Sequence, residues 1–334
     1  MPSPGNLAEP PLFVLGCGRS GTTMLRMMLT AHPDLAIPWE SHFIVPLWKG
    51  RRKLGGVRSP DVERVVGLIE ASSMFQLWEV PETAVRRRVD ALVRPTLGNV
   101  IEAMFRAYAD HQSKPRWGDK TPIYVMWLPA LAELFPTARF VHVIRDGRDV
   151  ALSYMTVPWG PDDIWSCAVK WRRDVGAGRR DGPVLGAERY MEIRYEALVQ
   201  EPQSALERIC EFARLGYDER MLDPSEDRSV GSRASLAAYH ASATKPPTPG
   251  LRDWRTQMSD EQVLAFEAVA GGLLTDLGYE RRYASIPRAT RVEAGARIAS
   301  AQGQSIASNV KKAALRTVRR AAPGSSERDS AERD

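Results

Sequence analysis

Short apolar runs alternate with stretches of helical periodicity along this chain of 334 residues. The apolar runs have the length of buried parallel strands. We predict strands at Pro11–Gly16, Arg139–Ile144 and Tyr190–Arg194. Apolar residues recurring every three or four positions predict helices at Thr22–Ala31, Pro122–Leu134, Ile164–Val175 and Pro202–Ala213, and a helical layer between residues 60 and 110. This alternation predicts an α/β fold of three layers, α/β/α, with a central parallel sheet.

The last helix of the domain carries a signal at each end. Ser259 and Gln262 form a capping box before a run of apolar residues at helical spacing, and Gly278 can stop the helix. From about Ser285 the chain is rich in Ala, Arg and Ser. We therefore expect one domain over residues 1–285 and a basic tail over residues 286–334 that is partly helical or disordered.

The formal charge of +5 describes this tail more than the domain. After Ile286, ten basic residues face five acidic ones, which is the whole surplus. Ile306, Val310, Ala314 and Val318 recur every four residues among lysines and arginines, as in a basic amphipathic helix that rests on anionic lipid or on a partner. A solvated helix or a disordered tail is the alternative interpretation.

Cysteine usage and the N-terminus indicate a cytoplasmic protein. Cys17, Cys167 and Cys210 lie far apart, with no paired spacing that would suggest disulfides or a zinc site. The first residues have no basic segment followed by an apolar stretch of signal-peptide length. We also expect no membrane span.

The segment Gly16-Cys-Gly-Arg-Ser-Gly-Thr-Thr23 lies between a predicted strand and a predicted helix. Backbone N–H groups of such a loop can surround an anion, and the helix N-terminus adds partial positive charge. Gly16 and Gly21 have the separation found in ATP-binding loops, but Thr22 stands where those loops have lysine. The positive charge is Arg19 instead, which suits a terminal phosphate or sulfate without a metal.

This segment resembles the 5′-phosphosulfate loop of sulfotransferases that use 3′-phosphoadenosine 5′-phosphosulfate (PAPS). With Thr22-Thr-Met-Leu-Arg26 and His32-Pro-Asp34 after it, the segment is most similar to the tyrosylprotein sulfotransferase branch. The resemblance implies a P-loop-like sulfotransferase fold, PAPS as co-substrate and no metal. It also implies that the donor is held by Gly18, Arg19, Ser20, Gly21, Thr22 and Thr23.

The resemblance implies a second anion site for the 3′-phosphate. Arg145 follows the strand at 139–144, and Ser153 comes eight residues later, two turns into the next helix. A surface turn in which Arg145 and Arg148 pair with Asp146 and Asp149 is the alternative. By the same resemblance, Tyr195 and Lys245 are further candidates for nucleotide contacts.

The catalytic candidates implied by the resemblance are Glu40, Arg19 and Lys120. Glu40 would be the general base, and the two cations would stabilise the oxygens as the S–O bond breaks. His42 is the rival base. The alternative for Glu40 is a structural ion pair with Arg19. The alternative for Lys120 is a solvated lysine in a loop.

We therefore expect a sulfotransferase acting on an acceptor hydroxyl. A P-loop nucleotide kinase-like enzyme and a non-catalytic nucleotide-binding scaffold are the alternatives. The acceptor stays open between a carbohydrate, a glycolipid, a small molecule and a peptide tyrosine. We expect no nucleic-acid partner, and the sequence leaves open a homodimer and a peripheral membrane contact through the tail.

Overall fold

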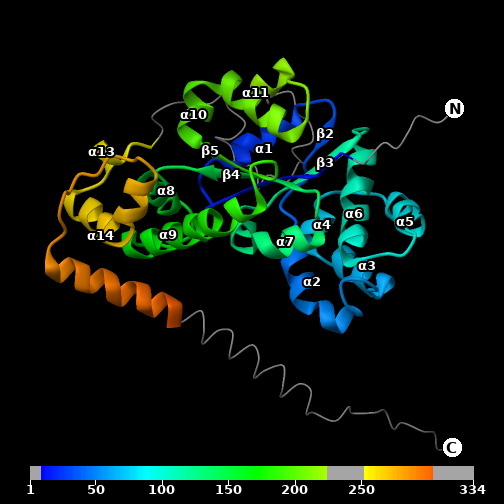
Figure 1. Cartoon of the computed structure of the whole chain (residues 1–334), viewed down its shortest axis with the longest axis horizontal. Helices are drawn as coiled ribbons and strands as arrows, with labels where there is room; N and C mark the ends of the chain where they lie inside the picture. Colours follow the sequence, from blue (N-terminus) through cyan, green and yellow to red (C-terminus); the bar gives the residue numbers. More distant parts are fainter. Residues whose placement is uncertain (1–8, 224–251, 304–334) are drawn as a thin grey trace, which may run out of the picture.

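The computed structural model describes residues 9–223 and 252–303, and its centre is a parallel sheet of five strands (Figure 1). The strand order is β2-β3-β1-β4-β5, so the first strand lies in the middle. The strands are β1 (Leu12–Gly16), β2 (Leu35–Ala36), β3 (Arg116–Lys120), β4 (Arg139–Ile144) and β5 (Tyr190–Arg194). Every strand pairing is parallel, so the carboxyl ends of the strands meet at one edge of the sheet.

Alternation along β1 divides the core between the two faces of the sheet. Phe13 and Leu15 pack into one hydrophobic cluster, whereas Leu12 and Val14 pack into another. The helices over the Leu12 face are α1 (Thr22–Thr30), α10 (Tyr195–Gln200) and α11 (Pro202–Ala213), with the short 3-10 helix η4 (Glu219–Leu222). These helices lie above the sheet in Figure 1.

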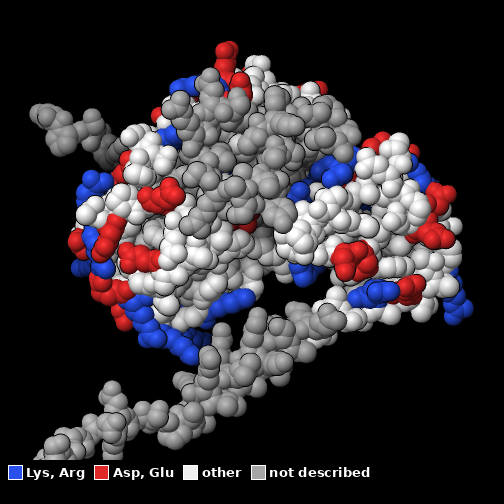
Figure 2. Space-filling model, turned by 180° about the vertical axis from the view of Figure 1, so that it is seen from behind, with Lys and Arg blue, Asp and Glu red and all other residues white. Residues whose placement is uncertain are grey.

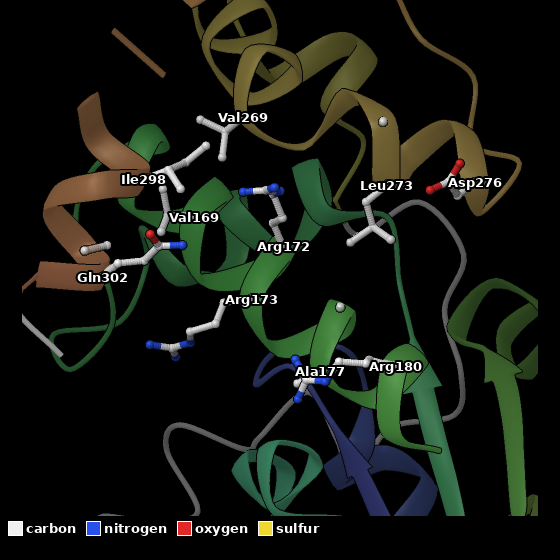
Figure 3. A pocket seen from close by; sticks show the side chains of 13 residues that line it. Val169, Arg172, Arg173, Ala177, Arg180, Val269, Leu273, Asp276, Ile298 and Gln302 are labelled. Carbon is white, nitrogen blue, oxygen red and sulfur yellow. The ribbon is translucent and has the colours of Figure 1, made fainter. Parts of the chain in front are cut away.

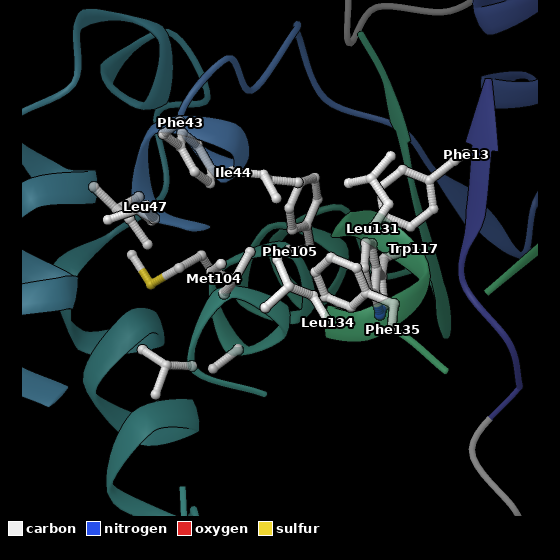
Figure 4. Packing of buried hydrophobic residues seen from close by; sticks show 14 of the residues in the cluster. Phe13, Phe43, Ile44, Leu47, Met104, Phe105, Trp117, Leu131, Leu134 and Phe135 are labelled. Carbon is white, nitrogen blue, oxygen red and sulfur yellow. The ribbon is translucent and has the colours of Figure 1, made fainter. Parts of the chain in front are cut away.

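The Phe13 face is covered by the helical layer predicted between residues 60 and 110 and by its neighbours. Its members are α2 (Ile44–Gly50), η1 (Arg51–Leu54), α3 (Val62–Glu70), α4 (Ser73–Gln76), α5 (Glu82–Asp90), α6 (Leu97–His111), η2 (Pro122–Trp127) and α7 (Leu128–Leu134). Aromatic rings fill the space next to the sheet: Phe105 stacks on Trp117 with ring centroids 4.5 Å apart, and Phe13 contacts both Trp117 and Phe135 (Figure 4). This packing holds β1 and β3 in register.

A third cluster lies beside β4 and β5. It is formed by α8 (Gly147–Tyr154), α9 (Ile164–Asp181), α13 (Trp254–Gln257) and α14 (Asp260–Asp276). The short 3-10 helix η3 (Pro183–Leu185) follows α9 in the chain. The capping box of Ser259 and Gln262 begins α14, as predicted. The predicted three-layer α/β/α fold with a parallel sheet is confirmed.

From the sequence no element is assigned to residues 116–120, where β3 lies. Three of its five residues are charged, yet all five are buried. Arg116 donates to the backbone carbonyls of Ala213 and Arg214, which satisfies a cation inside the fold. Partners from distant segments hold Arg116 and Lys120 in the strand, so a local apolar run is not needed.

Residues 288–303 are helical, and Ala294 of this segment is buried in the third cluster. The amphipathic pattern from Ile306 to Val318 lies outside the described residues, and the boundary near residue 285 stays a prediction. No helix in the described ranges is long and apolar enough to span a bilayer. Acidic and basic side chains are mixed over the visible described surface in Figure 2, as expected where the charge surplus belongs to the tail.

Candidate active site

The glycine-rich segment predicted to bind an anion is a tight loop between β1 and α1. Gly21 is the N-cap of α1 with φ 92°, a backbone conformation that favours glycine. A Cβ at Gly21 would lie 2.3 Å from Tyr195 Cδ2, and one at Gly18 would lie 2.4 Å from the Tyr154 hydroxyl. Both glycines are therefore required by aromatic rings that pack against the loop.

Polar atoms at this edge of the sheet lack protein partners. The Ser20 hydroxyl and Arg145 Nε are both buried, and neither atom has a hydrogen-bond partner among the described residues. A buried polar group without a partner costs about 1–3 kcal/mol. A donor carrying several phosphate or sulfate oxygens can satisfy both atoms, so these residues fit the predicted phosphosulfate compound.

Arg19 connects the two predicted anion sites. Its φ of 69° is in the left-handed region, and its Nε donates to the Ser153 hydroxyl over 3.0 Å. Burial lowers the pKa of the guanidinium, and the nearby cation Arg145 contributes in the same direction. Trp159, 56% exposed, lies with its ring centroid 5.7 Å from the Arg19 guanidinium carbon. Arg19 and Ser153 are 134 residues apart in sequence, and the fold brings them together.

Arg145 leaves the carboxyl end of β4, where open α/β sheets bind ligands. Its guanidinium carbon lies 4.3 Å from the centroid of the Tyr195 ring, and its closest ion pair, with Asp149, is a long 3.9 Å. Asp146 is instead paired with Arg148 at 2.7 Å. The predicted alternative is wrong in its surface position, because Arg145 is buried and has an unpaired Nε. The pairings that it named, Arg145 with Asp149 and Arg148 with Asp146, are present.

Glu40 lies between two nitrogen atoms. Its Oε1 is 2.6 Å from Lys120 Nζ, and its Oε2 is 2.8 Å from His42 Nε2. Lys120 also donates to the Thr23 hydroxyl at the start of α1, over 3.1 Å. The carboxylate is thus joined through one ammonium group to the glycine-rich loop.

These contacts correct two alternatives drawn from the sequence. Lys120 has no exposed side-chain surface, so the interpretation as a solvated loop lysine is wrong. The structural partners of Glu40 are Lys120 and His42, whereas Arg19 bonds Ser153. His42 and Glu40, which we treated as rival bases, are in contact.

Charge around Glu40 controls its ionisation. Burial alone would raise the pKa of Glu40, but the positive charge of Lys120 and the hydrogen bond with His42 lower it to about 2. The hydrogen bond with Glu40 raises the pKa of His42 above its ordinary 6.5, although burial opposes this. Neighbouring Asp119 is fully buried, which raises its pKa to about 6.

Arg26 is a residue at this site to which the sequence assigned no role. It lies buried in α1, and its Nε donates to the backbone carbonyls of Ile37 and Pro38 over 2.9 and 3.0 Å. Its guanidinium also lies 4.7 Å from the Trp39 ring centroid. Arg26 therefore fixes the segment that leads to Glu40. The only signal for this in sequence was its place in the motif after the loop.

The fold brings together Arg19, Glu40, Lys120, Arg145, Ser153 and Tyr195 with the loop residues 18–23. The predicted contact of Lys245 lies outside the described residues. Among the described residues, no group of three or more His, Cys, Asp and Glu side chains could hold a metal ion. The roles assigned to these residues stay predictions.

A groove lies away from this site. It has a volume of about 950 Å³ and runs between α9, α14 and the helical residues 288–303 (Figure 3). Arg172, Arg173 and Arg180 line it together with apolar residues such as Val269 and Leu273. Arg173 pairs with Asp174, and Arg180 pairs with Asp181, so much of this positive charge is neutralised.

Comparisons with known proteins agree with this geometry. A family model described as "Sulfotransferase family" matches residues 10–219. The chain is 25% identical over 289 residues to protein-tyrosine sulfotransferase A of Caenorhabditis elegans, and the alignment covers 82% of this chain and 68% of that protein. It is 26% identical over 293 residues to protein-tyrosine sulfotransferase 2 of Gallus gallus, and that alignment covers 83% of this chain and 71% of that protein.

A solved structure is similar in fold. The sulfotransferase domain from the Synechococcus PCC 7002 olefin synthase aligns with a TM-score of 0.57 and 24% identity. The alignment covers 81% of this chain and 95% of that domain. The predicted P-loop-like sulfotransferase fold and the predicted resemblance to the tyrosylprotein branch are both confirmed.

Proposed function

The chain belongs to the sulfotransferase family, and from that premise we propose that it transfers a sulfuryl group from PAPS to an acceptor hydroxyl, with Glu40 as general base. The observation that carries the proposal is the chain of contacts from Glu40 through Lys120 to Thr23. It puts a carboxylate beside the loop that would hold the donor. A general base must lie within hydrogen-bond reach of the proton that it removes.

The loop residues 18–23 would bind the 5′-phosphosulfate through backbone N–H groups and the Ser20 hydroxyl. Arg145 and Ser153 would bind the 3′-phosphate, and Tyr195 would pack against the nucleotide. Support for this comes from the unpaired Ser20 hydroxyl and Arg145 Nε, which lie at one sheet edge with the N-terminus of α1. Lys245 belongs to the same proposal.

Glu40 removes the proton of the acceptor hydroxyl while the acceptor oxygen forms its bond to sulfur. The bond between sulfur and the bridging oxygen breaks, and its electron pair stays on adenosine 3′,5′-bisphosphate. Arg19 and Lys120 offset the negative charge that develops on these oxygens. Both cations are already near the loop, so little reorganisation is needed as the charge develops.

The acceptor carries a hydroxyl group, and its class is the open part of the proposal. The names of the similar proteins from Caenorhabditis elegans and Gallus gallus point to protein tyrosine. Carbohydrate, glycolipid and small-molecule hydroxyls have the same reactive group and stay in the proposal. A cytoplasmic location is likewise proposed from cysteine usage alone.

Calorimetry on the full chain tests the donor site. We expect adenosine 3′,5′-bisphosphate to bind without added metal, and labelled sulfate from PAPS to appear on at least one of a panel of tyrosyl peptides, sugars and phenols. Tight binding of magnesium-ATP with no binding of the bisphosphate would reject the proposal in favour of a kinase-like enzyme. Bisphosphate binding without transfer to any acceptor class would favour a nucleotide-binding scaffold.

A further inference from the structure

The contact between Glu40 and His42 suggests that the two side chains act in sequence. We propose that His42 takes the proton from Glu40 after each transfer and releases it to solvent, so that Glu40 and His42 form one base with two members. This inference rests on the proposed function and adds a residue to it. It makes His42 the partner of Glu40, where the sequence alone made the two residues rivals.

The hydrogen bonds of Glu40 favour one route for a proton that it has taken up. Lys120 Nζ holds Oε1 at 2.6 Å, and an ammonium group has no lone pair with which to accept a proton. Oε2 faces His42 Nε2 at 2.8 Å, and an imidazole nitrogen can accept. Among the described groups that bond Glu40, His42 is therefore the one that can receive the proton.

Solvent exposure increases from Lys120 through Glu40 to His42. The side chain of Lys120 is 0% exposed, that of Glu40 is 23% exposed, and that of His42 is 46% exposed. The imidazole thus connects a partly buried carboxylate with bulk water. Its second nitrogen, Nδ1, can deliver the proton to solvent.

The backbone fixes His42 in this position. His42 has φ 50°, a left-handed conformation that costs a residue other than glycine about 1–2 kcal/mol. The residues beside it are anchored, since the Ser41 N–H donates to the Thr121 hydroxyl and the Ile44 N–H donates to the Tyr124 hydroxyl. Strain retained at a site is compensated by surrounding contacts, and here it aims the imidazole at Glu40.

The proton balance closes over one turnover. The acceptor O–H bond breaks, its electron pair forms the O–S bond, and the proton moves to Oε2 of Glu40. Between turnovers the Nε2–H of His42 donates to the Glu40 carboxylate. To receive the proton, neutral His42 takes its other tautomer, with its hydrogen on Nδ1, and then accepts that proton at Nε2. The resulting imidazolium loses the Nδ1 proton to water, and Glu40 is again a carboxylate.

This cycle requires neutral His42. The charged groups that face it are Glu40, Asp119 and Lys120, and the hydrogen bond with Glu40 raises the pKa of His42 above 6.5. Below that pKa His42 is protonated and cannot accept, and its positive charge further weakens Glu40 as a base. Activity should therefore be present above the raised pKa of His42 and fall as the pH drops through it.

The pH profile of kcat/KM for the acceptor tests the inference. It is measured on the full chain between about pH 5 and 8, where protein stability tends to be highest. For the wild-type protein we expect the acid limb above pH 6.5. In His42→Gln, which can still donate to Glu40 but cannot titrate, the limb should move to about 6 or lower, where buried Asp119 titrates. His111→Gln, at an exposed position at the end of α6, is the matched control and should keep the wild-type profile.

A second variant separates proton transfer from a structural role. His42→Ala should lose turnover, and added imidazole should restore it, because free imidazole can occupy the vacated space and accept the proton. An unchanged acid limb in His42→Gln, or no rescue of His42→Ala, would overturn the inference. If Glu40→Gln is fully active, the proposed base fails as well. If Glu40→Gln is inactive while the His42 variants behave as wild type, only the relay through His42 is rejected.

Discussion

Lys120 is a charged side chain with no exposed surface, and its partners explain why the fold tolerates it. Its ammonium group contacts the Glu40 carboxylate and the Thr23 hydroxyl. A buried charge is stable only when it is paired and hydrogen-bonded. The same pairing holds the pKa of Glu40 at about 2 against the opposing effect of burial, so Glu40 is a carboxylate throughout the neutral range.

Replacing Glu40 by Gln should abolish most of the turnover while donor binding persists. Loss of a general base reduces a rate by about 10² to 10⁴-fold. Adenosine 3′,5′-bisphosphate should bind with nearly unchanged affinity, because Glu40 contacts neither Ser20 nor Arg145. Initial rates with labelled PAPS and calorimetry measure the two effects, with Glu82→Gln at an exposed position of α5 as the control. Wild-type rates in Glu40→Gln would remove Glu40 from the role of base.

At the scale of elements, the sequence predicts what local pattern determines. The strand, loop and helix around Gly16 to Thr23 follow from an apolar run, glycines and helical spacing. His142 alternates with valines in β4, a pattern typical of a core histidine, and it is buried against the Tyr190 hydroxyl. Burial lowers its pKa to about 3, with Arg179 adding to the effect.

Elements and contacts that depend on distant partners escape such patterns. The strand β3 has no apolar run, and its charged residues Arg116 and Lys120 bond segments far along the chain. The pairing of His42 with Glu40 depends on a positive φ that no local pattern shows. The sequence therefore nominated both residues of the pair but could not show that they touch.

The loop between β1 and α1 should not tolerate a side chain at Gly21. Gly21→Ala would place a Cβ 2.3 Å from the Tyr195 ring at a φ of 92°. The backbone strain alone is about 1–2 kcal/mol, and the ring must also move, so affinity for adenosine 3′,5′-bisphosphate should fall about ten-fold or more. Calorimetry measures this loss.

Gly176→Ala in α9 is the control for this loop variant. A Cβ there meets nothing within 4 Å, and Ala is favoured over Gly in a helix by about 1 kcal/mol. Nucleotide affinity should therefore be unchanged. Equal affinities in the two variants would contradict the assignment of this loop as the donor site.

Across the whole molecule, a buried ion-pair network joins α14 to α8, the helix that follows β4. Arg148 of α8 bonds Asp146 and Glu267, and neither the Arg148 nor the Glu267 side chain has exposed surface. Glu267 also accepts hydrogen bonds from the backbone N–H groups of Arg282 and Tyr283. The same cluster surrounds α8, which carries Ser153, so the C-terminal part of the described chain supports the position proposed for the second anion site.

Glu267→Gln should destabilise the fold strongly. Removal of one partner from a buried ion pair costs about 3–5 kcal/mol, and we expect about 3 kcal/mol here because Arg148 retains Asp146. Urea unfolding measures the change in the free energy of unfolding. Glu261→Gln on the exposed side of α14 should change it by less than about 0.5 kcal/mol. Similar values for both variants would show that the network contributes little.

The ammonium group of Lys120 lies between the Thr23 hydroxyl of the glycine-rich loop and the Glu40 carboxylate. If the proposed donor binds at this loop, its sulfate near Thr23 would compete for this cation and draw it away from Glu40. The carboxylate would then gain proton affinity, so the loaded protein would have a stronger base than the empty one. In the proposed reaction, arrival of the first substrate would thus prepare the site for the second.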